Sequence, residues 1–139
     1  RYIPYVVETA VGCDRTVLMT LCDAFRKDSE RTWLALHPKL APYKVGVFPL
    51  MKKPELLEYT EKVLTNLRGK LRFITDGAGS IGKRYRRQDE IGTPYGVTID
   101  YDTLNDHTVT IRKRDSMEQE RIPSEKVLEV VHKGIESWP

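Results

Sequence analysis

The sequence predicts an α/β fold of three layers, in which a mixed sheet of about five strands lies between helices. Three observations support this prediction. Short apolar runs alternate with helical patterns between residues 43 and 94. The connections between these runs are long enough for helical crossovers, which join parallel strands. Two β-rich runs at 95–100 and 107–111 are separated by a turn, as in an antiparallel hairpin.

The N-terminal quarter is expected to be a separate strand–helix fragment. Residues 2–8 are rich in β-forming side chains, although Pro4 restricts them to a sheet edge or a bulge. Apolar residues then recur at helical spacing over about 13–27. Residues 36–42 contain two prolines and no periodicity, which is typical of a linker. The expected units are therefore 1–35 and 43–139.

The second unit is expected to begin with strand, helix, strand and helix. A buried run at 45–48 suits a parallel strand, and Pro54 begins a helix that Gly69 ends. A second strand follows at 71–75. Ser80 is a suitable N-cap for a helix that runs to about residue 90 and ends at Gly92.

The remaining elements complete the mixed sheet. The strand at 95–100 is followed by a turn at Asn105 and by the strand 107–111. Residues 117–122 suit a short further strand, and Pro123 opens a terminal helix. Two crossovers followed by a hairpin give the predicted three layers.

The loop from Gly77 to Gly82 fits two nucleotide-binding patterns, G-x-G-x-x-G and G-x-x-x-x-G-K. The second pattern lacks its magnesium ligand, because Arg84 stands where a Ser or Thr is required. The first is supported by Asp100, eighteen residues on, but the highly charged helix 83–90 has too narrow an apolar face for a dinucleotide fold. The remaining interpretation is a β-to-α turn that directs a row of cations outward.

Charge is mild overall and locally concentrated. The net charge is +3, but residues 83–87 and 112–114 together hold seven cations. Such runs are either solvated faces or contacts for a polyanion, and both interpretations stay open from composition alone.

Cysteine and histidine usage argues against a metal or a disulfide framework. Cys13 and Cys22 lie nine residues apart without a CxxC pattern, which favours reduced thiols in the core of an intracellular protein. His37, His107 and His132 share no ligand spacing, so we expect no metal site. No membrane-length apolar run or signal pattern is present, and we expect a cytoplasmic protein with no membrane partner.

Residues 80–94 resemble the signature of the anticodon-binding domain of glycyl-tRNA synthetases, a class II family. Residues 97–103, 109–112 and 114–119 continue the resemblance, and 36–42 resemble the entry to that domain. The resemblance implies that 43–139 form an anticodon-binding domain whose partner is the anticodon stem-loop of tRNA(Gly). It implies a parent that ligates glycine to this tRNA.

Residues 8–15 resemble motif 3 of the class II catalytic domain, with Thr9 and Ala10 in place of the usual Pro and Ser. The resemblance implies that Glu8 and Arg15 contact glycine and ATP in the parent, which would use magnesium and form a homodimer. The chain lacks motifs 1 and 2. We therefore expect this fragment to hold no cofactor and to be inactive without the missing catalytic domain.

RNA recognition assigns three kinds of candidate residue. Cations suit phosphates, acceptors suit the exocyclic amines of the two cytosines in glycine anticodons, and an exposed ring suits base stacking. The RNA-binding candidates are Lys83, Arg84 and Arg87 for the backbone, Asp100, Asp102, Thr103 and Arg112 for the bases, and Tyr101 for stacking. Tyr85 shares a stripe with Ile81 and is expected to face the core. Arg112 has an alternative role as an ion-pair partner of Glu118 or Glu120.

Two other functions stay open. One is a non-enzymatic interaction module, as in the accessory subunit of mitochondrial DNA polymerase, whose fold is similar to that of anticodon-binding domains. The other is a small dinucleotide-binding protein, which the glycine loop alone would permit.

Overall fold

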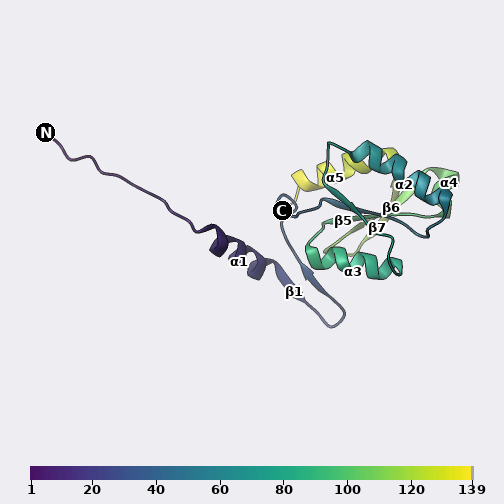
Figure 1. Ribbon diagram of the computed structural model, residues 1–139, viewed down its shortest axis with the longest axis horizontal. Coiled ribbons are helices and arrows are strands. Elements are labelled where there is room, and N and C mark those ends of the chain that lie inside the picture. The colour runs from purple at the N-terminus through teal and green to yellow at the C-terminus, as the bar shows by residue number, and fades with distance from the viewer. Residues whose placement is uncertain (139) are drawn as a thin grey trace.

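A five-stranded mixed sheet between two layers of helices forms the body of the protein in the computed structural model, which describes residues 1–138 (Figure 1). The helices are α1 (Cys13–Ala24), α2 (Pro54–Leu67), α3 (Ile81–Ile91), α4 (Tyr101–Asp106) and α5 (Val127–Glu136), the last preceded by a 3₁₀ turn at Ser124–Lys126. The strands are β1 (Phe25–Lys27), β2 (Thr32–Leu34), β3 (Val45–Pro49), β4 (Phe73–Thr75), β5 (Tyr95–Ile99), β6 (Thr108–Lys113) and β7 (Gln119–Pro123).

The strand order in the sheet is β4-β3-β5-β6-β7. β3 runs parallel to β4 and β5, whereas β5–β6 and β6–β7 are antiparallel pairs. In Figure 1, α2, α4 and α5 cover one face of the sheet and α3 covers the other. The predicted fold class is confirmed.

The main core lies between the sheet and the layer of α2 and α5. The strands supply β-branched residues that are fully buried, and α2 supplies an apolar stripe at helical spacing. This core includes Val45, Val47, Val97, Ile99, Val109, Ile111, Leu56, Val63, Leu64, Leu67, Val127 and Val131. Burial of this apolar surface is the chief stabilising term for the domain.

The charged helix α3 packs on the opposite face through one aromatic ring and through buried polar side chains at Arg84, Gln88 and Asp89. Tyr85 lies over Gly96 so closely that a Cβ there would be 2.3 Å from the ring. The ring meets Phe48 edge-on at 5.5 Å, and its hydroxyl lies 2.6 Å from Thr98 Oγ1. The prediction that Tyr85 faces the core is confirmed, and glycine in the strand explains how so polar a helix approaches the sheet.

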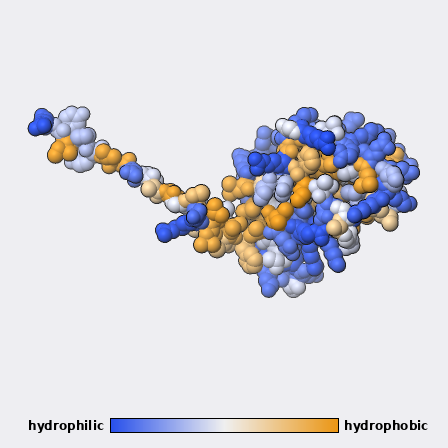
Figure 2. Space-filling view, in the orientation of Figure 1, coloured by the Kyte–Doolittle hydropathy of each residue, from blue (hydrophilic) through white to orange (hydrophobic). Residues whose placement is uncertain are grey.

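The N-terminal segment departs from its prediction. Residues 1–12 form an extended arm rather than a strand, and their apolar side chains are exposed (Figures 1 and 2). A β-rich sequence needs a neighbouring strand to complete its hydrogen bonds, and none of the described residues pairs with it. The helix α1 forms as expected, but Cys13 and Cys22 are free and exposed rather than buried.

Three elements, β1, β2 and α4, were missed by the sequence patterns. β1 and β2 form an antiparallel hairpin in which Phe25 is opposite Leu34, and this hairpin packs against α3. The expected turn at Asn105 is instead the last part of α4. This short helix ends at His107, whose φ of 57° is left-handed.

Candidate functional site

The loops that follow the three parallel strands meet at one edge of the sheet. Pro49 lies beside Ile99 and Val47 beside Thr75, so the chain leaves all three strands at the same end. We define the carboxyl edge as residues 50–53, 76–80 and 100–102 together with Lys83. Ligands of open α/β sheets bind outside the carboxyl ends of strands, because loops there diverge to opposite faces.

The loop between β4 and α3 is built around two arginines. Arg84 is 4% exposed and donates to the carbonyl oxygens of Pro49, Gly77 and Gly79, the last at 2.8 Å from Nη2. Arg87 donates to the Asp76 carboxylate and to the Ala78 carbonyl. Arg84, predicted to contact an RNA backbone, is instead a structural brace, because its donors are satisfied inside the protein.

Asp76 completes this brace. Its Oδ1 accepts a hydrogen bond of 2.7 Å from the Ala78 amide, and its Oδ2 pairs with Arg87. Partial burial opposes ionisation, but the Ala78 amide and the Arg87 guanidinium hold the pKa of Asp76 below its usual value. Arg87 keeps part of its surface in solvent, with 42% of its side chain exposed. It can meet a phosphate only while paired with Asp76.

Two more residues that were predicted to contact bases, Asp100 and Thr103, form the N-terminal cap of α4. The Asp100 carboxylate caps the helix by accepting from the Thr103 amide at 3.0 Å and hydroxyl at 2.9 Å. Its other oxygen accepts a hydrogen bond of 2.7 Å from Arg121. Thr103 is fully buried, so the prediction that it contacts a base directly is wrong for this conformation. Asp102, the next acidic residue, is exposed.

Tyr101 is the exposed ring of the edge. It is 37% exposed, and its hydroxyl donates to Met51 Sδ at 3.3 Å. The Lys53 ammonium lies 5.1 Å from the ring centre, within the range of a cation–π contact. A ring supported in this way presents a flat apolar surface beside a positive charge, as base stacking requires.

Three cations of the edge make no ion pair or side-chain hydrogen bond within residues 1–138. They are Lys52, Lys53 and Lys83. All three are exposed, and Lys52 lies over the glycine loop, with its Cε 2.9 Å from a Cβ placed on Gly77. Lys83 was predicted, whereas Met51, Lys52 and Lys53 were missed. The available signal was their place immediately after a buried parallel strand.

Arg112 lies away from this edge. Both of its terminal nitrogens donate to the Asp89 carboxylate, at 2.9 and 3.0 Å, and its guanidinium carbon is 4.9 Å from the Tyr85 ring centre. It is buried, so the expected contact with a base is wrong for this conformation. The alternative of a pair with Glu118 or Glu120 is also wrong, since its partner is on α3.

The remaining predicted residues lie in the N-terminal segment. Glu8, in the arm, and Arg15, in α1, are both exposed, and this segment extends away from the domain (Figure 1). Neither residue is brought near the carboxyl edge. Within residues 1–138 no group of three His, Cys, Asp or Glu side chains could hold a metal ion. None of the helices in that range is long and apolar enough to cross a bilayer.

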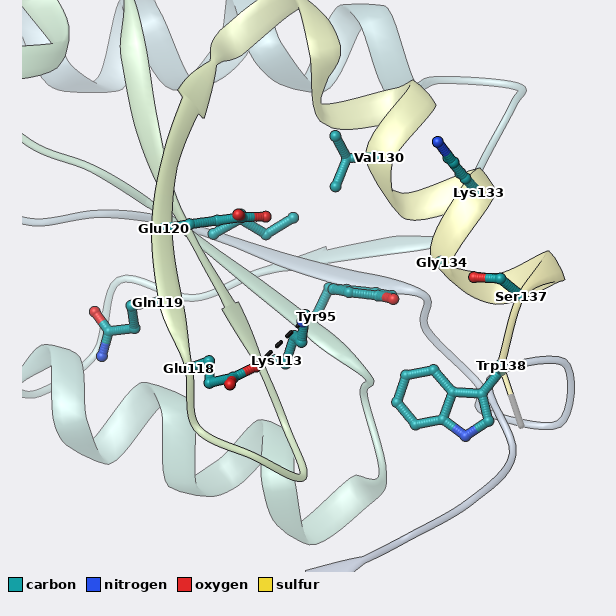
Figure 3. Close-up of a pocket in the computed structure, with 11 residues that line it drawn as sticks. Tyr95, Lys113, Glu118, Gln119, Glu120, Val130, Lys133, Gly134, Ser137 and Trp138 are labelled. Carbon is teal, nitrogen blue, oxygen red and sulfur yellow. Dashed lines mark hydrogen bonds and ion pairs between the residues drawn. The ribbon is translucent and has the colours of Figure 1, made fainter.

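A cavity of about 710 Å³ lies between α5 and the β6–β7 hairpin (Figure 3). Tyr95 and Trp138 form one wall, with ring centres 6.3 Å apart, and the Lys113–Glu118 ion pair forms another. Tyr95 begins β5, so this cavity is at the opposite end of the parallel strands from the carboxyl edge. The two features are therefore separate.

The comparisons with known proteins agree with this architecture. Residues 44–134 match the family described as "Anticodon binding domain", and the chain belongs to this family. The resemblance found in the sequence is thereby confirmed. Among solved structures, prolyl-tRNA synthetase from Cryptosporidium parvum, crystallised with L-proline and AMP, superposes with a TM-score of 0.70 at 22% identity. That match covers 76% of this chain and 23% of the synthetase, and it shows a shared fold.

The similar curated proteins are glycine–tRNA ligases. That of Borreliella burgdorferi is 55% identical over 127 residues, which cover 88% of this chain and 28% of the ligase. That of Treponema denticola is 46% identical over 147 residues, covering 99% of this chain and 33% of the ligase. That of Chlorobaculum tepidum is 52% identical, covering 93% and 28%. The chain thus spans a third or less of the length of these relatives.

Proposed function

We propose that this chain is the tRNA-binding part of a longer glycine–tRNA ligase and that its carboxyl edge reads the anticodon of tRNA(Gly). The observation that carries the proposal is the set of free cations beside an exposed ring, in a member of the anticodon-binding family whose curated relatives are glycine–tRNA ligases. An anticodon is single-stranded, so its bases can stack on a ring while its phosphates meet cations.

The contacts divide by chemistry. Lys52, Lys53 and Lys83 are exposed and unpaired, which suits them to phosphates. Tyr101 offers its ring to a base, with Met51 beside it. The free carboxylate of Asp102 is the acceptor best placed to meet the exocyclic amine of a cytosine.

The candidates whose side chains are bonded within the protein have positioning roles instead. Arg84 and Arg87 hold the loop that presents Lys83, and Asp100 with Thr103 fixes the first turn of α4 and thus Tyr101. Their removal would displace the edge rather than delete one contact. Buried groups of this kind are costly to leave without partners.

The N-terminal segment belongs to the same proposal. Its resemblance to motif 3 supports the assignment of residues 1–35 to a catalytic domain, in which Glu8 and Arg15 would contact glycine and ATP. That parent would require ATP with magnesium, would form a homodimer in the cytoplasm, and would supply the surface that covers the exposed apolar face of α1.

Binding to two anticodon stem-loops tests the proposal. One RNA carries the glycine anticodon, and the other has both cytosines replaced by uracil. We expect wild-type protein to prefer the first RNA, because each lost base contact costs about 1–3 kcal/mol. Fluorescence anisotropy at fixed salt measures both affinities.

Two variants separate the kinds of contact. Lys83→Ala should lower the affinity for both RNAs by the same factor and reduce the slope of log affinity against log salt by about 0.7. Asp102→Ala should reduce the ratio of the affinity for the cytosine-containing RNA to the affinity for the uracil-containing RNA. Equal affinity of the wild-type protein for both RNAs would contradict anticodon reading and favour the non-enzymatic interaction module.

A further inference from the structure

The hairpin of β1 and β2 packs against α3, and its side-chain hydrogen bonds to the domain come from one arginine. Arg31 lies in the turn before β2 and is almost buried, with 7% of its side chain exposed. Its Nη1 donates to Asp89 Oδ2 at 3.1 Å and to the Arg114 carbonyl at 2.7 Å, and its Nη2 donates to the Asp115 carbonyl at 2.9 Å. One planar group thus contacts two elements that lie far away in the sequence.

The acceptor on α3 is shared. The Asp89 carboxylate, 4% exposed, accepts from Arg31 on one side and from both terminal nitrogens of Arg112 on the other. Asp89 thus shares one negative charge between two guanidiniums, and the Asp28 carboxylate lies 4.0 Å from Arg31 Nε. Removal of Asp89 would leave two nearly buried guanidiniums without this carboxylate, so Asp89 holds β6, α3 and the hairpin together.

The segment that follows the hairpin is held as well. Arg114 donates from Nη1 to the carbonyl oxygens of Leu36 and Gly92, at 3.0 and 2.8 Å. The Lys44 ammonium donates to the carbonyl oxygens of Pro38 at 2.7 Å and Ala41 at 2.9 Å. Residues 36–42, which the sequence favours as a linker, are therefore bound to the domain along their length.

The arm and α1 contrast with this. No side-chain hydrogen bond or ion pair links residues 1–23 to residues 36–138. Only Ala24, at the end of α1, is buried. The part of the chain that is bonded to the domain through side chains therefore begins at the hairpin.

α3 connects the hairpin to the carboxyl edge. It carries Arg84 and Arg87, which hold the loop at 76–80, and nearer its C-terminus it carries Asp89. A helix of eleven residues is about 16 Å long and does not bend easily. The orientation of the hairpin is consequently tied to that of the edge.

We propose that residues 25–42 form one rigid body with the domain, that Arg31 is the positioning residue of this attachment, and that the joint to the preceding polypeptide is the junction of α1 and β1. The longer parent would then rotate about Ala24–Phe25 rather than within 36–42. This proposal depends on the contacts of the hairpin and not on RNA binding.

Distances between pairs of spin labels test it in the whole chain. The first pair joins Ser29→Cys in the hairpin turn to His132→Cys on α5, after both native cysteines are changed to serine. The second joins native Cys22 on α1 to His132→Cys, with Cys13→Ser. All these positions are exposed. We expect a single narrow distance for the first pair and a broad distribution for the second.

Arg31→Gln should broaden the first distribution severalfold while circular dichroism stays unchanged. Arg68→Gln, which breaks a pair with Glu61 that is exposed on both sides, is the matched control and should change nothing. Arg31→Lys should restore the narrow distance only in part, because one ammonium cannot reach the same three acceptors. If Arg31→Gln unfolds the chain, the two distance distributions in the protein that keeps Arg31 still test whether the hairpin is rigidly attached.

A broad first distribution, or a narrow second one, would overturn the proposal. So would a first distribution that stays narrow in a folded Arg31→Gln protein, since another contact would then hold the hairpin. The affinity for RNA is measured separately, so a loss of RNA binding cannot be mistaken for a failure of this attachment.

Discussion

At the scale of single residues, the fate of each cation in the run 83–87 is decided by what lies within reach of its side chain. Arg84 points inward and donates hydrogen bonds to three carbonyl oxygens, and Arg87 forms an ion pair with Asp76. Lys83 meets no partner within the described residues and stays in solvent. Adjacent residues of the same charge thus have different roles.

Arg84→Ala should therefore act on stability first. It would remove the donor of the buried Pro49 carbonyl oxygen and of the partly exposed carbonyl oxygens of Gly77 and Gly79, and a buried acceptor left unpaired costs about 1–3 kcal/mol. We expect the free energy of unfolding in urea to fall by about 2–4 kcal/mol. Lys83→Ala is the control, and a similar loss in both variants would contradict the brace.

Asp100 makes a separate prediction about acid. Burial opposes its ionisation, but Arg121 and the amide and hydroxyl of Thr103 outweigh burial and hold its pKa below the ordinary value. A lowered native pKa stabilises the fold above the unfolded pKa, and this stability is lost as pH falls through the native pKa. Asp100→Asn should lose stability at neutral pH and show a shallower fall below about pH 4.

Urea titrations at a series of pH values measure this difference. Asp102→Asn serves as the control, because that carboxylate is exposed. Parallel stability curves for wild type and Asp100→Asn across the acid range would show that the cap does not respond to protonation.

At the scale of elements, α3 depends on a glycine at its end and not on the one inside it. Gly92 has a φ of 83°, and a Cβ there would lie 2.8 Å from Leu36 Cδ1 and 3.1 Å from the Leu34 carbonyl. Gly82, in the first turn of the helix, has nothing within 4 Å of the same position. The hairpin can approach the end of α3 only because residue 92 has no side chain.

Gly92→Ala should lower the free energy of unfolding by about 1–3 kcal/mol, through the strained backbone and the contact with β2. Gly82→Ala should be neutral or stabilising by up to about 1 kcal/mol, since alanine favours helix. Urea unfolding of the two variants makes the comparison. An equal effect at both positions would contradict the close approach of the hairpin.

The long elements were predictable because each carries its own pattern. The apolar stripe of α2 and the buried runs of β3 and β5 depend on neighbours in the sequence, and Gly69 and Gly92 mark helix ends. α4 was missed because six residues are too few to show a helical period. Residues 2–8 were assigned to a strand because propensity alone does not supply a partner.

The candidate site was predictable only in outline. The sequence indicated a basic loop followed by an acidic strand end, and both lie at the carboxyl edge. It could not indicate which arginines bond inside the protein and are therefore not free for RNA. The acceptor of Arg84 at Pro49 is 35 residues away in the sequence, and the acceptor of Arg112 is on another element. Lys52 and Lys53 were missed although they follow a predicted parallel strand, because the register of the sheet brings the end of that strand beside the other two loops.

At the scale of the whole molecule, the arm makes no side-chain hydrogen bond or ion pair with the domain within the described residues, so we expect it to add nothing to the stability of the domain. Its side chains at Tyr2, Ile3, Tyr5, Val6 and Val7 are each more than 80% exposed. Exposed apolar surface of this extent favours association. Removal of residues 1–12 should leave the urea midpoint unchanged and reduce self-association in sedimentation velocity. A lower midpoint would mean that the arm packs on the domain.

The central claim is that RNA binds at the carboxyl edge, and a matched pair of double variants tests it most directly. Lys53→Ala with Tyr101→Ala removes the cation and ring of the edge. Lys62→Ala with Tyr59→Ala removes another such pair on α2, where the ammonium is 5.8 Å from the ring centre. Both proteins are first shown to be folded by urea unfolding.

The measurement is the affinity of each variant for the anticodon stem-loop of tRNA(Gly) at one salt concentration. We expect a loss of about tenfold or more for the edge variant, since base stacking alone contributes about 1–3 kcal/mol, and little change for the α2 variant. Unchanged affinity in the edge variant, or an equal loss in both, would contradict it.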